Sequence, residues 1–242
     1  MTLPRRNGIL AIPAPAGLVI GIAAKQANSI DYSAESPGIR RREKELLSTR
    51  IGAPTYKILM LNQVHGDRIV DINAVPADDP PTIADADGMI TALEGVCLVI
   101  RTADCVPVFV YDAARRVLGA VHSGWRGCRL DIAGKLVEHM KKAYGCRPGD
   151  LTAFILPGIG PGSYTINEDV AAHFPGHVTR DNGSILLDLP GSIRESLIRR
   201  GVPSDRLLAA THCTLEENDV FYSHRAGDSG RNLNFGLMPD KG

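Results

Sequence analysis

Three residues set far apart along the chain belong to types that commonly bind transition metals. They are His65, Cys105 and His122, and each lies in a short segment that also carries Gly or Asp. Two imidazoles and one thiolate suit zinc, and catalytic zinc sites commonly use three protein ligands and leave a fourth position open. The intervals from 65 to 105 and from 105 to 122 lack the compact regularity of a zinc finger. The residue types therefore favour a catalytic metal site, although the spacing alone does not establish one.

Two of these residues lie where predicted strands end. Cys105 falls between apolar runs at 96–100 and 106–111 that are rich in β-branched residues, and His122 follows a similar run at 117–121. Sites in α/β proteins commonly lie at strand ends beside a Gly-rich helix start, because free amides of the first helical turn can hold an anion. The strand ends near Cys105 and His122 are therefore the expected location of the site.

A turn and a helix are predicted directly after His122. Residues 123–127 are rich in Gly, and apolar side chains then recur at helical spacing from 130 to 144, where Gly145 ends the pattern. Further predicted elements are a strand-turn-strand unit at 8–24, a strand at 185–189 and a helix at 192–200. Strands and helices alternate without a strict βαβ rhythm. The sequence therefore predicts an α/β fold with mixed sheets, in a single domain over residues 1–242.

The composition is that of an ordinary globular enzyme. The 242 residues are 44% hydrophobic, which is enough for one sizeable core. Lys plus Arg and Asp plus Glu number 27 each, so no overall field favours nucleic acid. The run at 40–45 mixes both signs, as an exposed helix start does. We expect neither a nucleic acid nor a membrane as a partner, and the sequence does not indicate the oligomeric state.

Cysteine usage and the N-terminal segment both bear on localisation. Five cysteines form no paired framework, which is typical of a reducing compartment. The four outside the metal set are interpreted as core or surface thiols: Cys97, Cys128, Cys146 and Cys213. Two arginines at 5–6 precede an apolar stretch, as in an export signal, but Pro and Gly residues interrupt that stretch. A cytoplasmic enzyme is the prediction.

Six segments, taken in order, resemble the YfiH-like, laccase-domain family of polyphenol oxidoreductases and purine nucleoside phosphorylases. Together they span residues 62–232, most of the chain, and their order makes the match far more specific than any single motif. The segments are Gln-Val-His-Gly at 63–66, Ala-Asp-Gly-Met-Ile-Thr at 86–91, Thr-Ala-Asp-Cys-Val-Pro-Val at 102–108, His-Ser-Gly-Trp-Arg-Gly at 122–127, Pro-Gly-Ile-Gly-Pro at 157–161, and Phe-Tyr-Ser-His-Arg at 221–225 with Gly-Arg-Asn at 230–232.

This resemblance implies a fold, a metal and an activity. The implied fold is a layered α-β-β-α arrangement, and the implied zinc ligands are His65, Cys105 and His122. The implied reaction is phosphorolysis of adenosine or inosine to the base and ribose 1-phosphate, with adenosine deamination as a second activity. Purine nucleoside and phosphate are the expected small-molecule partners. The family's older polyphenol oxidase label needs a blue-copper site and a three-copper cluster. The chain has seven His and no His-x-His pair, so copper bound in vitro would be a single ion.

The sequence departs from the family pattern at two places, which makes it a divergent member. The family begins with a turn of the type Thr-Arg-x-Gly-Gly-Val-Ser, whose Arg is expected to hold phosphate, and Lys25 is the nearest equivalent here. Lys keeps the charge but loses the bidentate fork of Arg. Gly162 and Thr165 stand where the family usually has Cys and Glu. Phosphate binding would therefore depend on Lys25 in place of the family's Arg.

The candidate roles follow from these patterns. Cys105, Asp104 and His65 are the candidate catalytic residues, with Asp104 either a proton acceptor or a turn residue that caps local amides. Candidate substrate contacts are Gln63, Lys25, Arg126, Arg225 and Arg231. Trp125 either stacks on a purine or anchors the packing.

Two other functions fit the same residues. Cys105 as a nucleophile beside His122 or His65 would make a metal-free hydrolase, for example an amidase acting on a cell-wall precursor. The departures at Lys25 and Gly162 would instead fit a nucleoside-binding protein with impaired catalysis. Zinc content separates the first alternative from the metal enzyme, and turnover separates the second.

Overall fold

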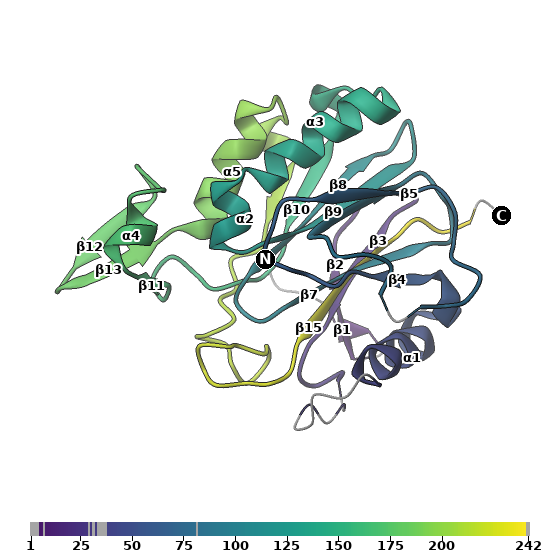
Figure 1. Cartoon of the computed structure of the whole chain (residues 1–242), viewed down its shortest axis with the longest axis horizontal. Coiled ribbons are helices and arrows are strands. Elements are labelled where there is room, and N and C mark those ends of the chain that lie inside the picture. The colour runs from purple at the N-terminus through teal and green to yellow at the C-terminus, as the bar shows by residue number, and fades with distance from the viewer. Residues whose placement is uncertain are drawn as a thin grey trace.

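Two six-stranded mixed sheets lie at the centre of the computed structural model, which describes residues 5–6, 8–28, 30, 32, 38–80 and 82–240 (Figure 1). The first sheet has the order β1 (Arg5–Arg6), β2 (Ile9–Ile12), β3 (Val19–Ala23), β15 (Asn232–Leu237), β7 (Cys97–Thr102), β4 (Ile58–Met60). The second has the order β14 (Leu207–Ala209), β10 (Thr152–Ile155), β8 (Val106–Asp112), β9 (Val117–Ser123), β6 (Gly88–Thr91), β5 (Ile69–Ile72). Both sheets contain parallel and antiparallel pairs, which confirms the predicted mixed sheets.

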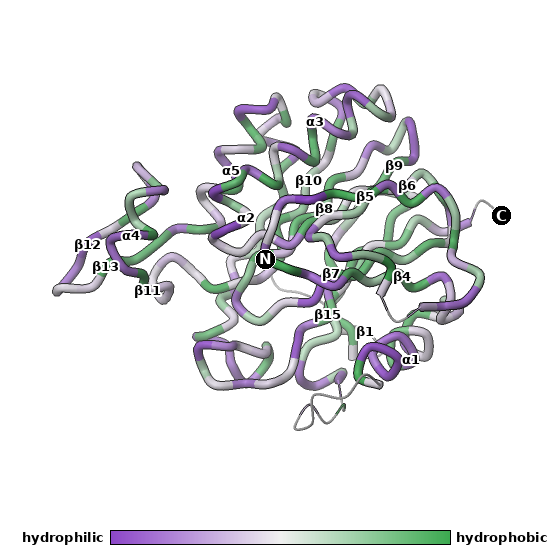
Figure 2. The backbone as a smooth tube through the Cα atoms, in the orientation of Figure 1, coloured by the Kyte–Doolittle hydropathy of each residue, from purple (hydrophilic) through white to green (hydrophobic). Residues whose placement is uncertain are grey.

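Alternation of side chains along the central strands produces four layers. In β7, Leu98 and Ile100 belong to the core between the two sheets, whereas Cys97 and Val99 pack on the opposite side with Leu47 of α1 (Ile39–Ile51). β8 behaves in the same way, because its aromatic side chains enter the core between the sheets and its valines pack under helices α3 (Ile132–Tyr144) and α5 (Leu189–Arg199). Successive strand residues face opposite sides, so each sheet buries both of its faces. Hydrophobic residues concentrate in these strands (Figure 2). The implied α-β-β-α arrangement is confirmed.

Helices α3 (Ile132–Tyr144) and α5 (Leu189–Arg199) cover the outer face of the second sheet (Figure 1). Gly145 ends α3 in the left-handed conformation, as predicted. α5 begins earlier than predicted, and the strand before it ends at Leu187 rather than at 189. The reason is Asp188, whose carboxylate accepts the Gly191 amide and caps a helix that has a proline in its first turn.

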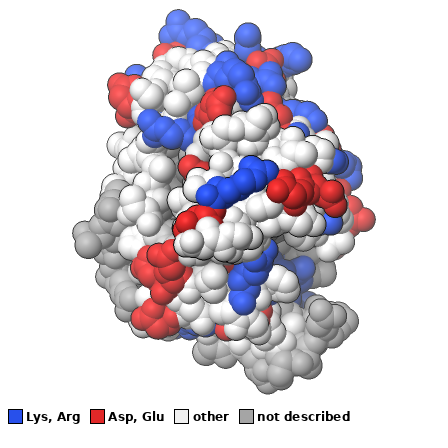
Figure 3. Space-filling model, turned by 90° about the vertical axis from the view of Figure 1, so that its left-hand side faces the viewer, with Lys and Arg blue, Asp and Glu red and all other residues white. Residues whose placement is uncertain are grey.

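A small third sheet projects from this body beside α4 (Glu168–Ala171) (Figure 1). Its strands are β11 (Thr165–Ile166), β13 (Ser184–Leu187) and β12 (Val178–Asp181), in that order. Short 3-10 turns lie at Thr55–Lys57, Pro148–Asp150 and Ser204–Arg206. Basic and acidic side chains intermingle on the face shown in Figure 3. Among the helices of the described ranges, none is both long and apolar enough to cross a membrane.

The charged run at 40–45 at the start of α1 was predicted to be exposed, and the prediction holds for Arg41, Arg42 and Glu45 but not for Glu43 and Lys44. Glu43 and Lys44 are buried, at 0% and 3% exposure. The Glu43 carboxylate accepts the Tyr32 hydroxyl at 2.9 Å, and its other oxygen lies 2.7 Å from Nε of Arg101. The Lys44 ammonium pairs with Asp79. A mixed-sign run is compatible with burial here because each buried charge has an oppositely charged partner.

Replacement of Glu43 by Ala is expected to destabilise the fold. Loss of the carboxylate leaves the Arg101 guanidinium and the Tyr32 hydroxyl without their buried partner, at a cost of about 3 kcal/mol. Urea unfolding followed by circular dichroism measures this change. Glu45→Ala, on an exposed position of the same helix, is the matched control and is expected to change stability by about 0.5 kcal/mol or less. Equal losses in the two variants would contradict the structural role of Glu43.

Candidate metal centre

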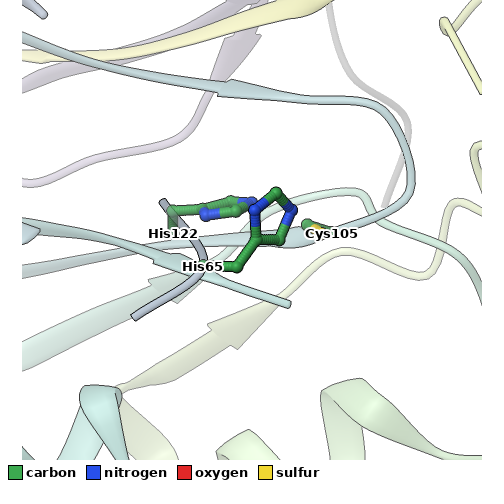
Figure 4. Close-up of side chains that lie close together, drawn as sticks. All are labelled: His65, Cys105 and His122. Atoms are coloured by element: carbon green, nitrogen blue, oxygen red, sulfur yellow. The ribbon is translucent and has the colours of Figure 1, made fainter. Parts of the chain in front are cut away.

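The three predicted metal ligands come together at one place, although they are distant in sequence (Figure 4). His65 lies in the loop after β4, Cys105 directly precedes β8, and His122 lies near the end of β9. One donor atom from each residue lies within 4.8 Å of the others. The two imidazole rings meet edge to face, with centroids 4.9 Å apart. His65 is exposed while His122 is buried, so the cluster has one side open to solvent.

Charge coupling within the cluster shifts two pKa values in opposite directions. Burial would raise the pKa of the Cys105 thiol, but the charge of His122 and hydrogen bonds from both imidazoles outweigh burial and lower it to about 6. Burial would lower the pKa of His122, but Cys105 and Asp87 together raise it to about 9. Without a metal, the two groups therefore form a thiolate and imidazolium pair near neutral pH. A thiolate is the form of cysteine that binds metal.

Asp87, at the residue before β6, holds two of the ligands in place. Its Oδ1 lies 2.8 Å from Nδ1 of His122 and accepts the His65 amide at 3.0 Å. Its Oδ2 accepts the amides of Val64 and Gly66 at 3.2 and 2.7 Å. Burial opposes ionisation of this carboxyl, but these hydrogen bonds, with that to His122 the strongest, keep its pKa below the usual value. One buried carboxylate thus orients an imidazole and fixes the loop that carries the other.

The Asp87 contact also tests whether the cluster suits a metal. Because Nδ1 of His122 is hydrogen-bonded to the Asp87 carboxylate, Nε2 is the nitrogen left to bind an ion. Metal-binding histidines usually donate their other ring N–H to a carboxylate in this way. Two nitrogens and a thiolate sulfur are donors that zinc accepts. The three side chains could therefore hold a metal ion, with zinc suited to the donor set.

Left-handed backbone conformations occur at two residues of the site. His65 has φ of 60° and Asp104 has φ of 83°. Such values are uncommon for residues other than Gly and persist where the surroundings enforce them. Asp87 fixes the first, through three amides of the loop. The second is fixed by Asp104 itself, whose carboxylate accepts the Thr214 hydroxyl at 2.7 Å and the Arg225 amide at 2.8 Å.

These contacts bear on the two roles left open for Asp104. Asp104 is buried, with 7% of the residue exposed. Both of its carboxylate oxygens accept hydrogen bonds from the 214–225 segment. This geometry favours the anchoring role over that of a proton acceptor. The carboxylate joins the strand break that carries Cys105 to the C-terminal segment that carries Arg225.

Close approach of the backbone at Gly124 shapes the cluster from the side of α2 (Trp125–Arg129). A Cβ atom at this position would lie 2.8 Å from Sγ of Cys105 and 3.5 Å from Cδ2 of His65. Only a residue without a side chain leaves the thiol where it is. The segment predicted as a turn over 123–127 is instead the end of β9 and the start of α2, and its Gly124 packs against the ligands.

Of the predicted substrate contacts, two arginines lie on aromatic rings. The Arg126 guanidinium is exposed and lies over Trp125, 4.5 Å from the ring centroid. The Arg225 guanidinium lies over Tyr164 at 5.2 Å, and one of its nitrogens donates to the Thr165 carbonyl at 2.8 Å. A guanidinium has five N–H donors, and the contacts named here use at most one of them in each residue, so either can bind an anion.

The other three predicted contacts are engaged by the protein itself. Gln63 forms two 2.8 Å hydrogen bonds with the backbone of Arg101. The Lys25 ammonium lies 2.8 Å from the Asp228 carboxylate and donates to the Asn218 carbonyl at 2.7 Å. Arg231 donates to the carbonyls of residues 229 and 230. Their roles in substrate binding stay predictions, and the observed contacts are structural.

Two residues important to the site were not assigned roles from the sequence. Asp87 lies in the Ala-Asp-Gly segment before a buried strand, and an acidic residue beside an apolar run was the one available signal. Tyr164 is placed beside the cluster: burial raises its pKa to about 12, with a further contribution from the negative charge of Cys105. No periodicity in the sequence distinguishes this tyrosine from an ordinary loop residue.

Comparison with known proteins gives a consistent set of relatives. The family model described as "Multi-copper polyphenol oxidoreductase laccase" matches residues 21–238. A purine nucleoside phosphorylase of Deinococcus radiodurans is 34% identical over 208 residues, covering 84% of this chain and 79% of that protein. The purine nucleoside phosphorylase YlmD of Geobacillus stearothermophilus is 32% identical over 216 residues, covering 81% and 76%.

Two solved structures share the fold over almost their whole length. The crystal structure of YlmD from Geobacillus stearothermophilus superposes with a TM-score of 0.90 at 26% identity and covers 99% of each chain. The hypothetical protein YfiH of Bacillus licheniformis gives a TM-score of 0.85 at 23% identity, covering 96% of this chain and 97% of that one.

Replacement of Gly124 by Ala is expected to weaken zinc binding by about tenfold or more, because the new methyl group displaces the Cys105 thiol from the two imidazoles. Competition with a fluorescent zinc chelator measures the affinity. Gly149→Ala is the control, since a Cβ there meets nothing within 4 Å. Unchanged affinity in the Gly124 variant would show that the thiol is not a ligand.

Replacement of Asp87 by Asn is expected to lower zinc affinity by roughly 10- to 100-fold, the usual effect of losing the carboxylate behind a ligating histidine. The same competition assay applies, with Asp85→Asn, an exposed carboxylate two residues away, as the control. If both variants bind zinc like the wild type, Asp87 does not support a metal ligand.

Proposed function

Because the chain belongs to the laccase-domain, YfiH-like family, which includes purine nucleoside phosphorylases, we propose that it is a zinc-dependent purine nucleoside phosphorylase. Adenosine or inosine and phosphate would be the substrates, and adenosine deamination a second activity. The observation that carries the proposal is the convergence of His65, Cys105 and His122, with Asp87 behind His122. We further propose that residues 1–242 form a single domain.

The residues around the cluster have distinct tasks in this reaction. When bound, zinc supplies a Lewis acid that can polarise an oxygen atom of the substrate or activate water. Asp87 keeps His122 in one orientation, and Asp104 fixes the loop before Cys105. Arg126 and Arg225 have guanidinium groups able to hold phosphate or ribose oxygens.

Support for phosphate binding lies with the arginines rather than with Lys25. The Lys25 ammonium already has a carboxylate and a carbonyl as acceptors, and it lies 5.6 Å from the centre of the Tyr222 ring. Use of Lys25 by phosphate would require its separation from Asp228. Arg126 is exposed and pairs with no carboxylate of the described residues, so it is the better candidate.

A metal-free hydrolase is the second candidate, because the cluster activates a thiolate. The lowered pKa of Cys105 beside a protonated His122 is the state from which a cysteine nucleophile attacks. The same thiolate would bind zinc, so the geometry is compatible with both a metal-free hydrolase and a zinc enzyme. Zinc content of the purified protein and the identity of the products distinguish them.

The test incubates zinc-loaded protein with adenosine, and separately with inosine, in the presence and absence of phosphate, and separates the products by chromatography. We expect phosphate-dependent release of free base, reduced about a hundredfold or more in Cys105→Ala because the metal site is lost. Cys146→Ala, which removes a thiol outside the cluster, is the matched control.

Other outcomes have definite meanings. Inosine formed from adenosine without phosphate would leave the deaminase activity alone and reject the phosphorylase. Binding of purines without turnover, in protein that holds zinc, would indicate a nucleoside-binding protein with impaired catalysis. Full activity in zinc-free protein would reject the metal enzyme.

A further inference from the structure

A cavity of about 320 Å³ lies apart from the three metal ligands, none of which lines it. Its walls are the end of α2, the start of α3, one side of α5 and the loop after α4, where the projecting third sheet joins the body. The inner part of the cavity is apolar and includes the buried side chains of Ile132, Phe174 and Ile193. Its rim carries charged and polar groups.

The two carboxylates at this rim are already neutralised. Asp131 accepts hydrogen bonds from Ser196 and from Arg200. Glu195 pairs with His177 and lies within 3.7 Å of Arg199. Neither carboxylate therefore offers an unpaired negative charge to an occupant.

The lining also contains a cation without a carboxylate partner. No carboxylate of the described residues pairs with the Arg129 guanidinium, whose contact is the His173 imidazole, with Nη1 and Nε2 3.4 Å apart. An arginine beside an imidazole is suited to an anion with several oxygens, because the guanidinium can donate two parallel hydrogen bonds to it. The hydroxyl of Ser192 on α5 adds a further polar group to the lining.

From this arrangement we propose that the cavity binds a phosphorylated small molecule, with the phosphate at the remaining N–H donors of Arg129 and the organic part against Phe174 and Ile193. The size of the cavity supports an organic part, since its volume of about 320 Å³ is about ten times the roughly 30 Å³ that one water molecule occupies in the liquid. The proposal does not depend on the reaction at the metal centre.

Helix α2 connects this cavity to the metal centre. Its C-terminal end supplies Cys128 and Arg129 to the cavity, while Gly124, just before its first residue, packs on the Cys105 thiol. The cavity and the metal centre therefore border opposite ends of the same short helix.

Isothermal titration with ribose 5-phosphate tests the proposal, with ribose and inorganic phosphate as separate probes. We expect ribose 5-phosphate to bind the full-length protein about tenfold or more tightly than either probe, because Arg129 would hold the phosphate while the C–H face of the sugar contacts the Phe174 ring. Arg129→Gln is expected to weaken binding by about tenfold or more. Arg147→Gln, at an exposed arginine outside the cavity, is the control and is expected to leave it unchanged.

Cys105→Ala separates this site from the metal centre. Binding of ribose 5-phosphate that persists in this variant and is lost in Arg129→Gln supports the proposal. Binding lost in Cys105→Ala but retained in Arg129→Gln would place the ligand at the metal centre and overturn it. Equal binding of ribose and ribose 5-phosphate, or no binding of the phosphorylated sugar, would also overturn it.

Discussion

The buried carboxylate of Asp87 is the constraint on which the metal centre depends. It contacts the imidazole of His122 on one sheet and three successive amides of the loop that leaves the other sheet and carries His65. A fully buried carboxylate is stable only when hydrogen bonds replace its water, and here those hydrogen bonds come from the two segments that must meet. The hydrogen bonds that stabilise the buried charge therefore also fix the geometry of the site.

Much of this arrangement was predictable from residue types and periodicity. The mixed sheets, the helix that ends at Gly145 and the convergence of His65, Cys105 and His122 all agree with the sequence, because each depends on local patterns or on strong ligand chemistry. The role of Asp87 was not predictable, since it depends on a contact across 35 residues. The burial of Glu43 and Lys44 likewise depends on partners far along the chain.

Engaged side chains explain why the substrate contacts were harder to predict than the metal ligands. A histidine or cysteine is recognisable as a potential ligand wherever it lies, but an arginine or lysine is useful to substrate only if the fold leaves it free. Lys25 and Gln63 have their donors committed within the protein, whereas Arg126 does not. That difference is decided by tertiary contacts, which the sequence alone does not reveal.

The position of the three ligands relative to the sheets has a mechanical consequence. His65 follows β4 of the first sheet, His122 belongs to β9 of the second, and Cys105 lies on the connection from β7 to β8, which passes from one sheet to the other. An ion held by all three would therefore cross-link the two sheets at the end where these segments lie. Metal affinity would then add to the resistance of the two sheets to separation, and partial unfolding at this end would release the ion.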